Sequence, residues 1–308
     1  MAFETTTAEV IDGIDLSGRI AVVTGATTGL GRETARTLAS AGAHVVVCGR
    51  TADKCQTSID EILAAHPDAS LEFEPFDLGK LSTVRVAADA IVARHPQISI
   101  LVNNAGVMFT PEGRTVDGFE TQFGTNHLGH FVFTNHLMPA LRAGAPSRIV
   151  NLSSAGHGFS DILWNDPNYS SRSYDKFEAY GQSKTANILF TVGLEARHAG
   201  IGVRSNAVHP GMIMTDLARH MGEDDMAELG ARAAQREAAG NGGGLPQFKT
   251  IEQGAATSVF AAVSPSLEGI GGRYLENVEF AEPAAWATET DAAERLWAMS
   301  ESLVGESF

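Results

Sequence analysis

Tyr180 and Lys184 lie four residues apart in the stretch AYGQSKTAN, inside a pattern typical of a long helix. A free phenol titrates near pH ~10, and a cation one helical turn away favours its ionised form. Such a pair can donate and accept a proton near neutral pH. Tyr169 and Tyr174 have no lysine four residues later, so we set them apart from this chemistry. Because the spacing is common on helix surfaces, the function of the pair depends on what surrounds it.

A glycine-rich turn, TGATTGLG, joins the first apolar run of the chain to the first helical pattern. Glycine allows the backbone to approach a pyrophosphate, and a helix N-terminus offers free N–H groups and a positive dipole end. A plain tight turn is the alternative, but this position between strand and helix favours a nucleotide site. The predicted cofactor-binding residues of the turn are Gly25, Thr27, Thr28, Gly29, Leu30 and Gly31.

The end of the second apolar run bears on the choice of cofactor. Folds that bind NAD usually place an acidic residue there, on the adenosine ribose, whereas this chain has Gly49 and Arg50. A guanidinium can bind a 2′-phosphate that a carboxylate would repel. We therefore predict NADP(H), with NAD(H) as the alternative. Asp53 nearby weakens this prediction, and Arg50 could also be an ordinary solvated side chain.

Apolar runs alternate with helical patterns along the chain, and they must position these groups. Runs such as VVVCG and ILVN are apolar nearly throughout, which is typical of a parallel sheet buried on both faces. The alternation predicts an α/β, doubly wound (Rossmann) seven-stranded parallel sheet with helices on both faces. The strands are expected in RIAVVTGA, HVVVCG, LEFEPFD, ISILVNNAG, RIVNLSS, GVRSNAVHP and GRYL.

We interpret residues 1–308 as a single domain, preceded by an extension over residues 1–15. Long helices are expected over 115–143 and around Tyr180, up to about residue 199. An irregular insert covers 156–175, and residues 212–250 are interpreted as a substrate lid, although part of them could equally form an ordinary amphipathic helix.

Composition excludes several classes of protein. Hydrophobic residues make up 44% of the chain and charged residues 19%, as in globular proteins, and the net charge is −15. That charge argues against nucleic acid and against an anionic membrane surface as partners. The N-terminus shows no signal peptide, no run is long enough for a membrane anchor, and Cys48 and Cys55 are expected as free thiols. These features predict a cytoplasmic location.

These motifs, in this order, resemble those of the short-chain dehydrogenases/reductases. The resemblance rests on TGATTGLG, the Asp77-Leu78 pair, NNAG, GTNHLGHF, IVNLSS, the Tyr180–Lys184 pair and HPG, and it extends from about Leu16 to Val304. The strings DGFETQFGTNHLGHF, QSKTANILF and AAERLWAMS are most similar to the branch that contains retinol dehydrogenases and WW-domain oxidoreductases. Retinol dehydrogenases often have an N-terminal membrane anchor, and we expect none here because residues 1–16 are acidic and polar.

The resemblance implies roles for four catalytic residues. Tyr180 would be the general acid/base, and Lys184 would lower the pKa of its phenol and hydrogen-bond the nicotinamide ribose. Ser154, preferred over Ser153 because it closes the string N-x-S-S, would bind the substrate oxygen. Asn126 would anchor a water that passes protons from Lys184, although it could instead stabilise a helix kink. The insert makes the gap between the serine and the tyrosine longer than is usual in the family.

The same resemblance implies further cofactor contacts at the carboxyl ends of strands. These residues are Asp77 and Leu78 beside the adenine, Asn104, Ala105 and Gly106 along the ribose, and Pro210, Gly211, Ile213 and Thr215 on the nicotinamide side. No metal is expected. The spacing of His127, His130 and His136 could suggest metal ligands, but these histidines lie in an apolar helical stretch. The resemblance implies homodimers or homotetramers through the long helices, although this branch also includes monomers.

The sequence thus predicts an oxidoreductase that interconverts a secondary alcohol and a ketone, or an alcohol and an aldehyde, with NADP(H). The apolar lid region favours a bulky hydrophobic substrate such as a steroid, a retinoid or an aromatic alcohol. Three alternatives remain open. They are a catalytically idle nucleotide sensor or scaffold, a dehydratase or epimerase, and a double-bond reductase of the protochlorophyllide reductase type.

Overall fold

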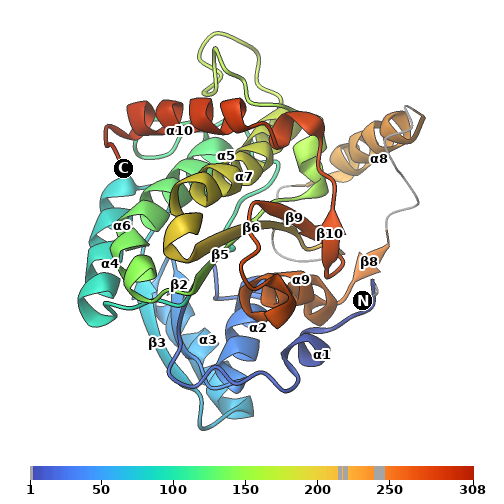
Figure 1. The fold of residues 1–308 in the computed structure, drawn as a ribbon. Coiled ribbons are helices and arrows are strands. Elements are labelled where there is room, and N and C mark those ends of the chain that lie inside the picture. Colours follow the sequence, from blue (N-terminus) through green and yellow to red (C-terminus); the bar gives the residue numbers. More distant parts are fainter. Residues whose placement is uncertain (1–2, 214–216, 218–220, 239–246) are drawn as a thin grey trace.

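A central eight-stranded sheet organises the computed structural model, which describes residues 3–213, 217, 221–238 and 247–308 (Figure 1). Its strand order is β10-β9-β6-β5-β4-β1-β2-β3. Seven strands pair in parallel, as predicted, and β10 adds an antiparallel edge to β9. The strands are β1 (Ile20–Thr24), β2 (His44–Gly49), β3 (Ser70–Pro75), β4 (Ile100–Asn103), β5 (Ser147–Leu152), β6 (Val203–His209), β9 (Arg273–Glu276) and β10 (Glu279–Ala281).

The apolar strands are buried on both faces of the sheet. Along β2, Val45 and Val47 pack into one core and Val46 and Cys48 into another, because successive side chains of a strand point to opposite faces. The first core includes residues of α2, α3 and α9, and the second includes residues of α4, α6, α7 and α10. This two-sided burial explains why the strands read as continuous apolar runs.

Helices cover both faces of the sheet. They are α1 (Thr7–Ile11), α2 (Gly29–Ser40), α3 (Ala52–Ala65), α4 (Leu81–Arg94), α5 (Thr121–Phe123), α6 (Gly129–Ala143), α7 (Lys176–His198), α8 (Glu223–Ala238), α9 (Ile251–Val263) and α10 (Thr290–Val304). Among these described helices, none is both long and apolar enough to cross a lipid bilayer. α10 lies across α7 (Figure 1), and Trp297 of α10 packs against Phe131 and Phe190.

The helix expected over 115–143 is shorter and is interrupted. Residues 115–120 form a turn, in which Gly118 has a φ of +89° that a right-handed helix cannot contain. Helix α5 begins at Thr121, and a π-helical turn over Gly124–Leu128 then precedes α6. The sequence-based prediction was therefore wrong at this N-terminus and did not anticipate the π-helical turn.

The lid region leaves the main sheet after β6. The short strands β7 (Met212–Ile213) and β8 (Phe248–Lys249) pair with each other, and α8 projects from the body of the fold (Figure 1). Residues 214–216, 218–220 and 239–246 of this region lie outside the described residues, and Thr215 is one of them.

Candidate active site

The glycine turn between β1 and α2 fits a pyrophosphate. Gly25 has a φ of +64°, and a β-carbon on it would lie 2.8 Å from the Cα of Ala105. A β-carbon on Gly31 would lie 2.3 Å from the Nδ2 atom of Asn104. Thr28, the N-cap of α2, makes no side-chain capping bond, so the first-turn N–H groups remain available for an anion.

The start of the NNAG segment is fixed to the glycine turn. The Asn104 side chain donates to the carbonyl oxygen of Thr24 at 2.8 Å, and the Thr24 hydroxyl accepts the N–H groups of Asn104 and Ala105 at 2.9 and 3.0 Å. The segment predicted to line the ribose and the turn predicted to hold the pyrophosphate therefore form one rigid unit.

The predicted adenosine side lies at the ends of β2 and β3. A β-carbon on Gly49 would lie 2.5 Å from the Thr27 side chain, so Thr27 packs against the end of β2. Arg50 follows and is exposed, with no ion pair to any residue that the structure describes. Asp77 accepts the N–H of Gly79 at 2.9 Å, while Leu78 is buried.

The predicted nicotinamide side follows β6. Gly211 has a φ of +95° and continues from Pro210 into β7. A β-carbon on Gly254 would lie 2.6 Å from Ile213 and 2.8 Å from Leu30. Ile213 therefore lies beside the first turn of α2, and its contact with the cofactor stays a prediction. Thr215 lies outside the described residues, so its role stays a prediction.

Tyr180, Ser154 and Lys184 lie together above the sheet although the insert separates the serine from the tyrosine. Tyr180 and Lys184 both point inward from α7 and are 3% and 4% exposed. The Lys184 Nζ atom donates to the carbonyl oxygen of Leu152 at 3.1 Å and lies 5.7 Å from the centroid of the Tyr180 ring. The Ser154 side chain interacts with the Tyr180 phenol, whereas Ser153 donates to a backbone carbonyl of α7. The catalytic role of Ser154 stays a prediction.

The expected lowering of the phenol's pKa does not occur in the protein by itself. Burial raises the pKa of Tyr180 to about 12, and the interaction with Ser154 only partly opposes this rise. Burial also lowers the pKa of Lys184 to about 8, so the ammonium is itself disfavoured. Desolvation is the main cause of both shifts because both groups are enclosed by protein. The positive charge of an oxidised nicotinamide, when bound, would favour the ionised phenol.

Asn126 occupies the π-helical turn and joins three segments. Its Oδ1 atom accepts the Val107 N–H at 2.8 Å, and its Nδ2 atom donates to the Val107 carbonyl at 2.9 Å and to the Ser183 hydroxyl at 2.9 Å. The side chain therefore joins the π-helical turn to Val107 and to α7. Asn126 Oδ1 and Lys184 Nζ both lie close to Gly106. The relay itself stays a prediction.

His130 is a polar residue of the site that the sequence did not single out for this purpose. Its Nδ1 atom lies 2.9 Å from the Asn126 carbonyl oxygen and its Nε2 atom 2.9 Å from the Thr24 hydroxyl. A carbonyl oxygen only accepts, so Nδ1 carries the proton and Nε2 accepts from Thr24. Burial lowers the pKa of His130 to about 4, which keeps the ring neutral. His130 thus connects the glycine turn to Asn126, and its position four residues after Asn126 was the available signal.

An apolar cluster surrounds the Tyr180 ring. It includes the buried rings of Phe109 and Phe177. The Phe109 centroid lies 5.1 Å from the Tyr180 centroid and 4.4 Å from the Phe177 centroid. Partly buried apolar side chains complete it, and they are Met108, Phe159, Met221 and Leu229. Sequence reasoning identified the lid as apolar but not the aromatic wall formed by the segment after NNAG and the start of α7.

Helix α8 is held over this cluster by charged contacts. Arg232 pairs with Asp175 at 2.9 Å, and its guanidinium lies 4.8 Å from the Phe177 ring centroid. Lys176 forms a second ion pair with Asp225. Because Asp175 is the N-cap of α7, these contacts fix α8 beside the turn that leads to Tyr180.

The hydroxyl groups of Tyr169 and Tyr174 make hydrogen bonds within the protein, which agrees with their exclusion as candidates for the general acid/base. The Tyr169 hydroxyl donates to Glu178 at 3.0 Å, and the Tyr174 hydroxyl donates to the Thr110 carbonyl at 3.1 Å. Burial is the main cause that raises the pKa of both phenols.

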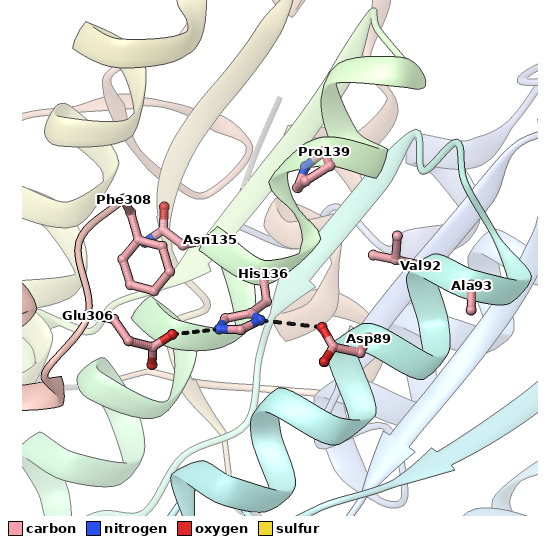
Figure 2. Close-up of a pocket in the computed structure, with 8 residues that line it drawn as sticks. All are labelled: Asp89, Val92, Ala93, Asn135, His136, Pro139, Glu306 and Phe308. Carbon is pink, nitrogen blue, oxygen red and sulfur yellow. Dashed lines mark hydrogen bonds and ion pairs between the residues drawn. The ribbon is translucent and has the colours of Figure 1, made fainter.

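A surface hollow of about 500 Å³ lies between α4, α6 and the C-terminal segment (Figure 2). Figure 2 shows His136 between Glu306 and Asp89, with N–O distances of 2.9 and 3.5 Å. None of the predicted catalytic or cofactor-binding residues lines this hollow. Its ion pairs anchor the C-terminus to α4 and α6, so we assign the chemistry to the other site.

Comparison with known proteins agrees with this assignment. The sequence profile described as short chain dehydrogenase matches residues 19–226. Retinol dehydrogenase 13 of Mus musculus is 39% identical over 290 residues, covering 94% of this chain and 85% of the relative. A crystal structure of a putative uncharacterized protein from Mycobacterium paratuberculosis is 33% identical with a TM-score of 0.76, covering 99% of each chain.

A further solved structure bears on the cofactor. It is a putative NAD(P) dependent gluconate 5-dehydrogenase from Beutenbergia cavernae with bound NADP, 28% identical with a TM-score of 0.65, covering 89% of this chain and 99% of that one. Fold, glycine turn and comparisons together define an oxidoreductase that uses a nicotinamide cofactor. The chain belongs to the short-chain dehydrogenase family, in its retinol dehydrogenase branch.

Proposed function

We propose that this protein interconverts a bulky apolar alcohol and its ketone or aldehyde with NADP(H), using Tyr180 as general acid/base. The observation that carries the proposal is the enclosure of the Tyr180 phenol between the polar pair Ser154 and Lys184 and the aromatic residues Phe109 and Phe177. One side of the phenol suits a reacting oxygen, and the other suits an apolar body.

The residues of the chain have separate tasks in this reaction. A bound nicotinamide supplies the hydride in reduction and accepts it in oxidation. Ser154 donates a hydrogen bond to the substrate oxygen and stabilises negative charge that develops there. Tyr180 gives that oxygen its proton in reduction and removes it in oxidation. Lys184 holds the nicotinamide ribose, and Asn126 anchors a water that returns protons from Lys184.

Two observations favour the finer assignments. The exposed Arg50 guanidinium, at the carboxyl end of β2 and without an ion pair in the described part of the chain, suits the 2′-phosphate of NADP(H). The relative named retinol dehydrogenase acts, by that name, on a bulky apolar alcohol, which agrees with the aromatic cluster here. We leave homodimers or homotetramers as a prediction.

Initial rates with steroid, retinoid and aromatic alcohols and ketones test the proposal, each measured with NADP(H) and NAD(H). We expect turnover of at least one bulky substrate and a fall in kcat of about 10²–10⁴-fold in Tyr180→Phe, with little change in cofactor affinity. Cofactor binding without turnover of any substrate would instead support the sensor or scaffold alternative. Reduction of a conjugated carbon–carbon double bond in preference to all carbonyls would support the double-bond reductase.

A further inference from the structure

Three potential metal ligands meet at the amino edge of the sheet, at the opposite end of the strands from the cofactor. His44 begins β2, Glu72 lies in β3, and His95 directly follows α4. In the β2–β3 register His44 pairs with Ser70, so His44 and Glu72 point to the same face, which α4 covers. One donor atom from each of the three residues lies within 4.8 Å of the others.

The separations between these donor atoms suit a tetrahedral metal ion. The His95 Nε2 atom lies 2.9 Å from Glu72 Oε1, and the His44 Nε2 atom lies 3.7 Å from Glu72 Oε2. Zinc bonds to imidazole and carboxylate are ~2.0–2.2 Å long, so tetrahedral ligands lie about 3.3 Å apart. The two distances, each to a different oxygen of Glu72, lie on either side of that value. Side-chain rotations that bring one of these oxygens close to both imidazoles would accommodate the ion.

The His44 ring is oriented for coordination. Its Nδ1 atom lies 2.7 Å from the Ser70 hydroxyl. Its Nε2 atom is buried and has no hydrogen-bond partner among the described residues. A buried nitrogen without a partner is unfavourable. Metal-bound histidines typically direct one nitrogen to the ion and hold the other by a hydrogen bond, and Ser70 provides that bond.

The charges around the cluster suit a cation. His95 and Arg94 both lie within hydrogen-bond distance of Glu72 Oε1, and a bound ion would replace the His95 contact. The Arg94 Nε atom donates to Glu72 Oε1 at 3.1 Å, which leaves Oε2 facing His44. Arg94 is also paired with Glu74, at 2.8 Å, and this pair offsets part of its charge.

From this arrangement we infer that His44, Glu72 and His95 form a zinc site, with water as the fourth ligand. Two imidazoles and one carboxylate are a donor set that zinc prefers. The ion would join β2, β3 and the end of α4 and stabilise the folded chain. It takes no part in hydride transfer because its ligands lie at the strand ends opposite those that carry the cofactor residues. This zinc site departs from the sequence-based expectation of no metal.

Isothermal titration of the chelator-treated full chain with zinc tests the site. We expect one zinc ion per chain, bound with a Kd on the order of micromolar. His44→Gln and His95→Gln, which retain a polar side chain, should each weaken binding at least about tenfold. His66→Gln is the matched control, because His66 lies outside the cluster, where its Nε2 atom is 3.1 Å from Arg36. Absence of binding, or unchanged binding in both cluster variants, would overturn the inference.

Two further measurements separate loss of the site from loss of the fold. At saturating zinc the melting temperature of the wild type should rise by roughly 5 °C, and those of the cluster variants should not. Without zinc, the cluster variants and the control should melt within a few degrees of the wild type. The cobalt-loaded wild type should show the visible absorption of a tetrahedral site. A cobalt spectrum that persists in His95→Gln would place the metal elsewhere.

Discussion

The Oδ1 atom of Asn126 and the Nζ atom of Lys184 approach the same point in space, the position where Gly106 lacks a side chain. A β-carbon at Gly106 would lie 3.2 Å from the first atom and 3.6 Å from the second. The space between the amide and the ammonium is therefore open because residue 106 is glycine. A water in that space could bridge the two groups, as the proposed proton relay requires.

Gly106→Ala should therefore impair proton transfer more than binding. The added methyl group would fill the space between Asn126 and Lys184, so we expect kcat to fall about 10- to 100-fold while cofactor affinity changes much less. Steady-state rates and cofactor titration measure the two effects. Gly200→Ala is the control, because a β-carbon at Gly200 meets no atom within 4 Å. Equal kcat values for the two variants would contradict the relay.

His130→Leu should weaken both the nucleotide site and turnover, because His130 connects Thr24 to Asn126. We expect a several-fold loss of cofactor affinity together with a roughly tenfold fall in kcat. His127→Leu is the matched control. His127 is also buried, but it contacts Ser300 at 2.8 Å on α10 instead of the site. If both variants lost only stability, His130 would have no positioning role.

Arg232→Ala should raise KM for bulky substrates and leave KM for small ketones nearly unchanged. The substitution removes the ion pair with Asp175 and the contact with the Phe177 ring, which hold α8 over the apolar cluster. Arg197→Ala is a close control. It removes an ion pair with Glu294 and a guanidinium 4.0 Å from the Trp297 ring centroid, both remote from Tyr180. A similar KM change in both variants would argue against a lid function of α8.

Arg50→Ala should reduce the preference for NADP(H). Removal of the guanidinium should lower kcat/KM for NADPH about 10- to 100-fold, since a charged hydrogen bond to phosphate is lost. The value for NADH should hardly change and serves as the internal reference. An equal fall in kcat/KM with both cofactors would indicate that Arg50 supports the loop and does not bind the 2′-phosphate.

The ionised Glu33 side chain should increase the free energy of unfolding, and this contribution should disappear at acidic pH. Burial opposes ionisation, but hydrogen bonds from Arg36 and Thr7 outweigh it and lower the pKa of Glu33 below its ordinary value of 4.5. The folded chain then binds this proton less readily than the unfolded chain. The stabilisation is therefore complete above about pH 5 and is lost as the pH falls through the folded-state pKa.

Urea unfolding of Glu33→Gln measures this contribution. We expect the variant to lose roughly 1–3 kcal/mol of unfolding free energy at pH 7 and much less near pH 3. The exposed Glu112→Gln should match the wild type at both values. A deficit that is independent of pH would show that packing, and not charge, accounts for the effect of Glu33.

The hydrophobic pattern of the sequence was sufficient to predict the fold class, because it shows which strands are buried. A parallel strand that is covered on both faces is apolar nearly throughout. The strands β1, β2 and β4 could therefore be identified from their apolar runs. The N-terminus of α5 was misplaced because the helical periodicity continues through Gly118, whose positive φ ends any helix there. The antiparallel β10 has only three residues, too few for a periodic signal.

The sequence also determined the catalytic candidates, since residue type and spacing placed Tyr180, Lys184 and the glycine turn at strand and helix ends. Tertiary structure alone decided the rest. It brought Ser154 across the insert to Tyr180, connected His130 to Thr24, and enclosed the phenol so completely that burial raises its pKa to about 12. These relationships depend on distances between segments remote in the chain and on exclusion of water, and neither quantity is encoded in local spacing.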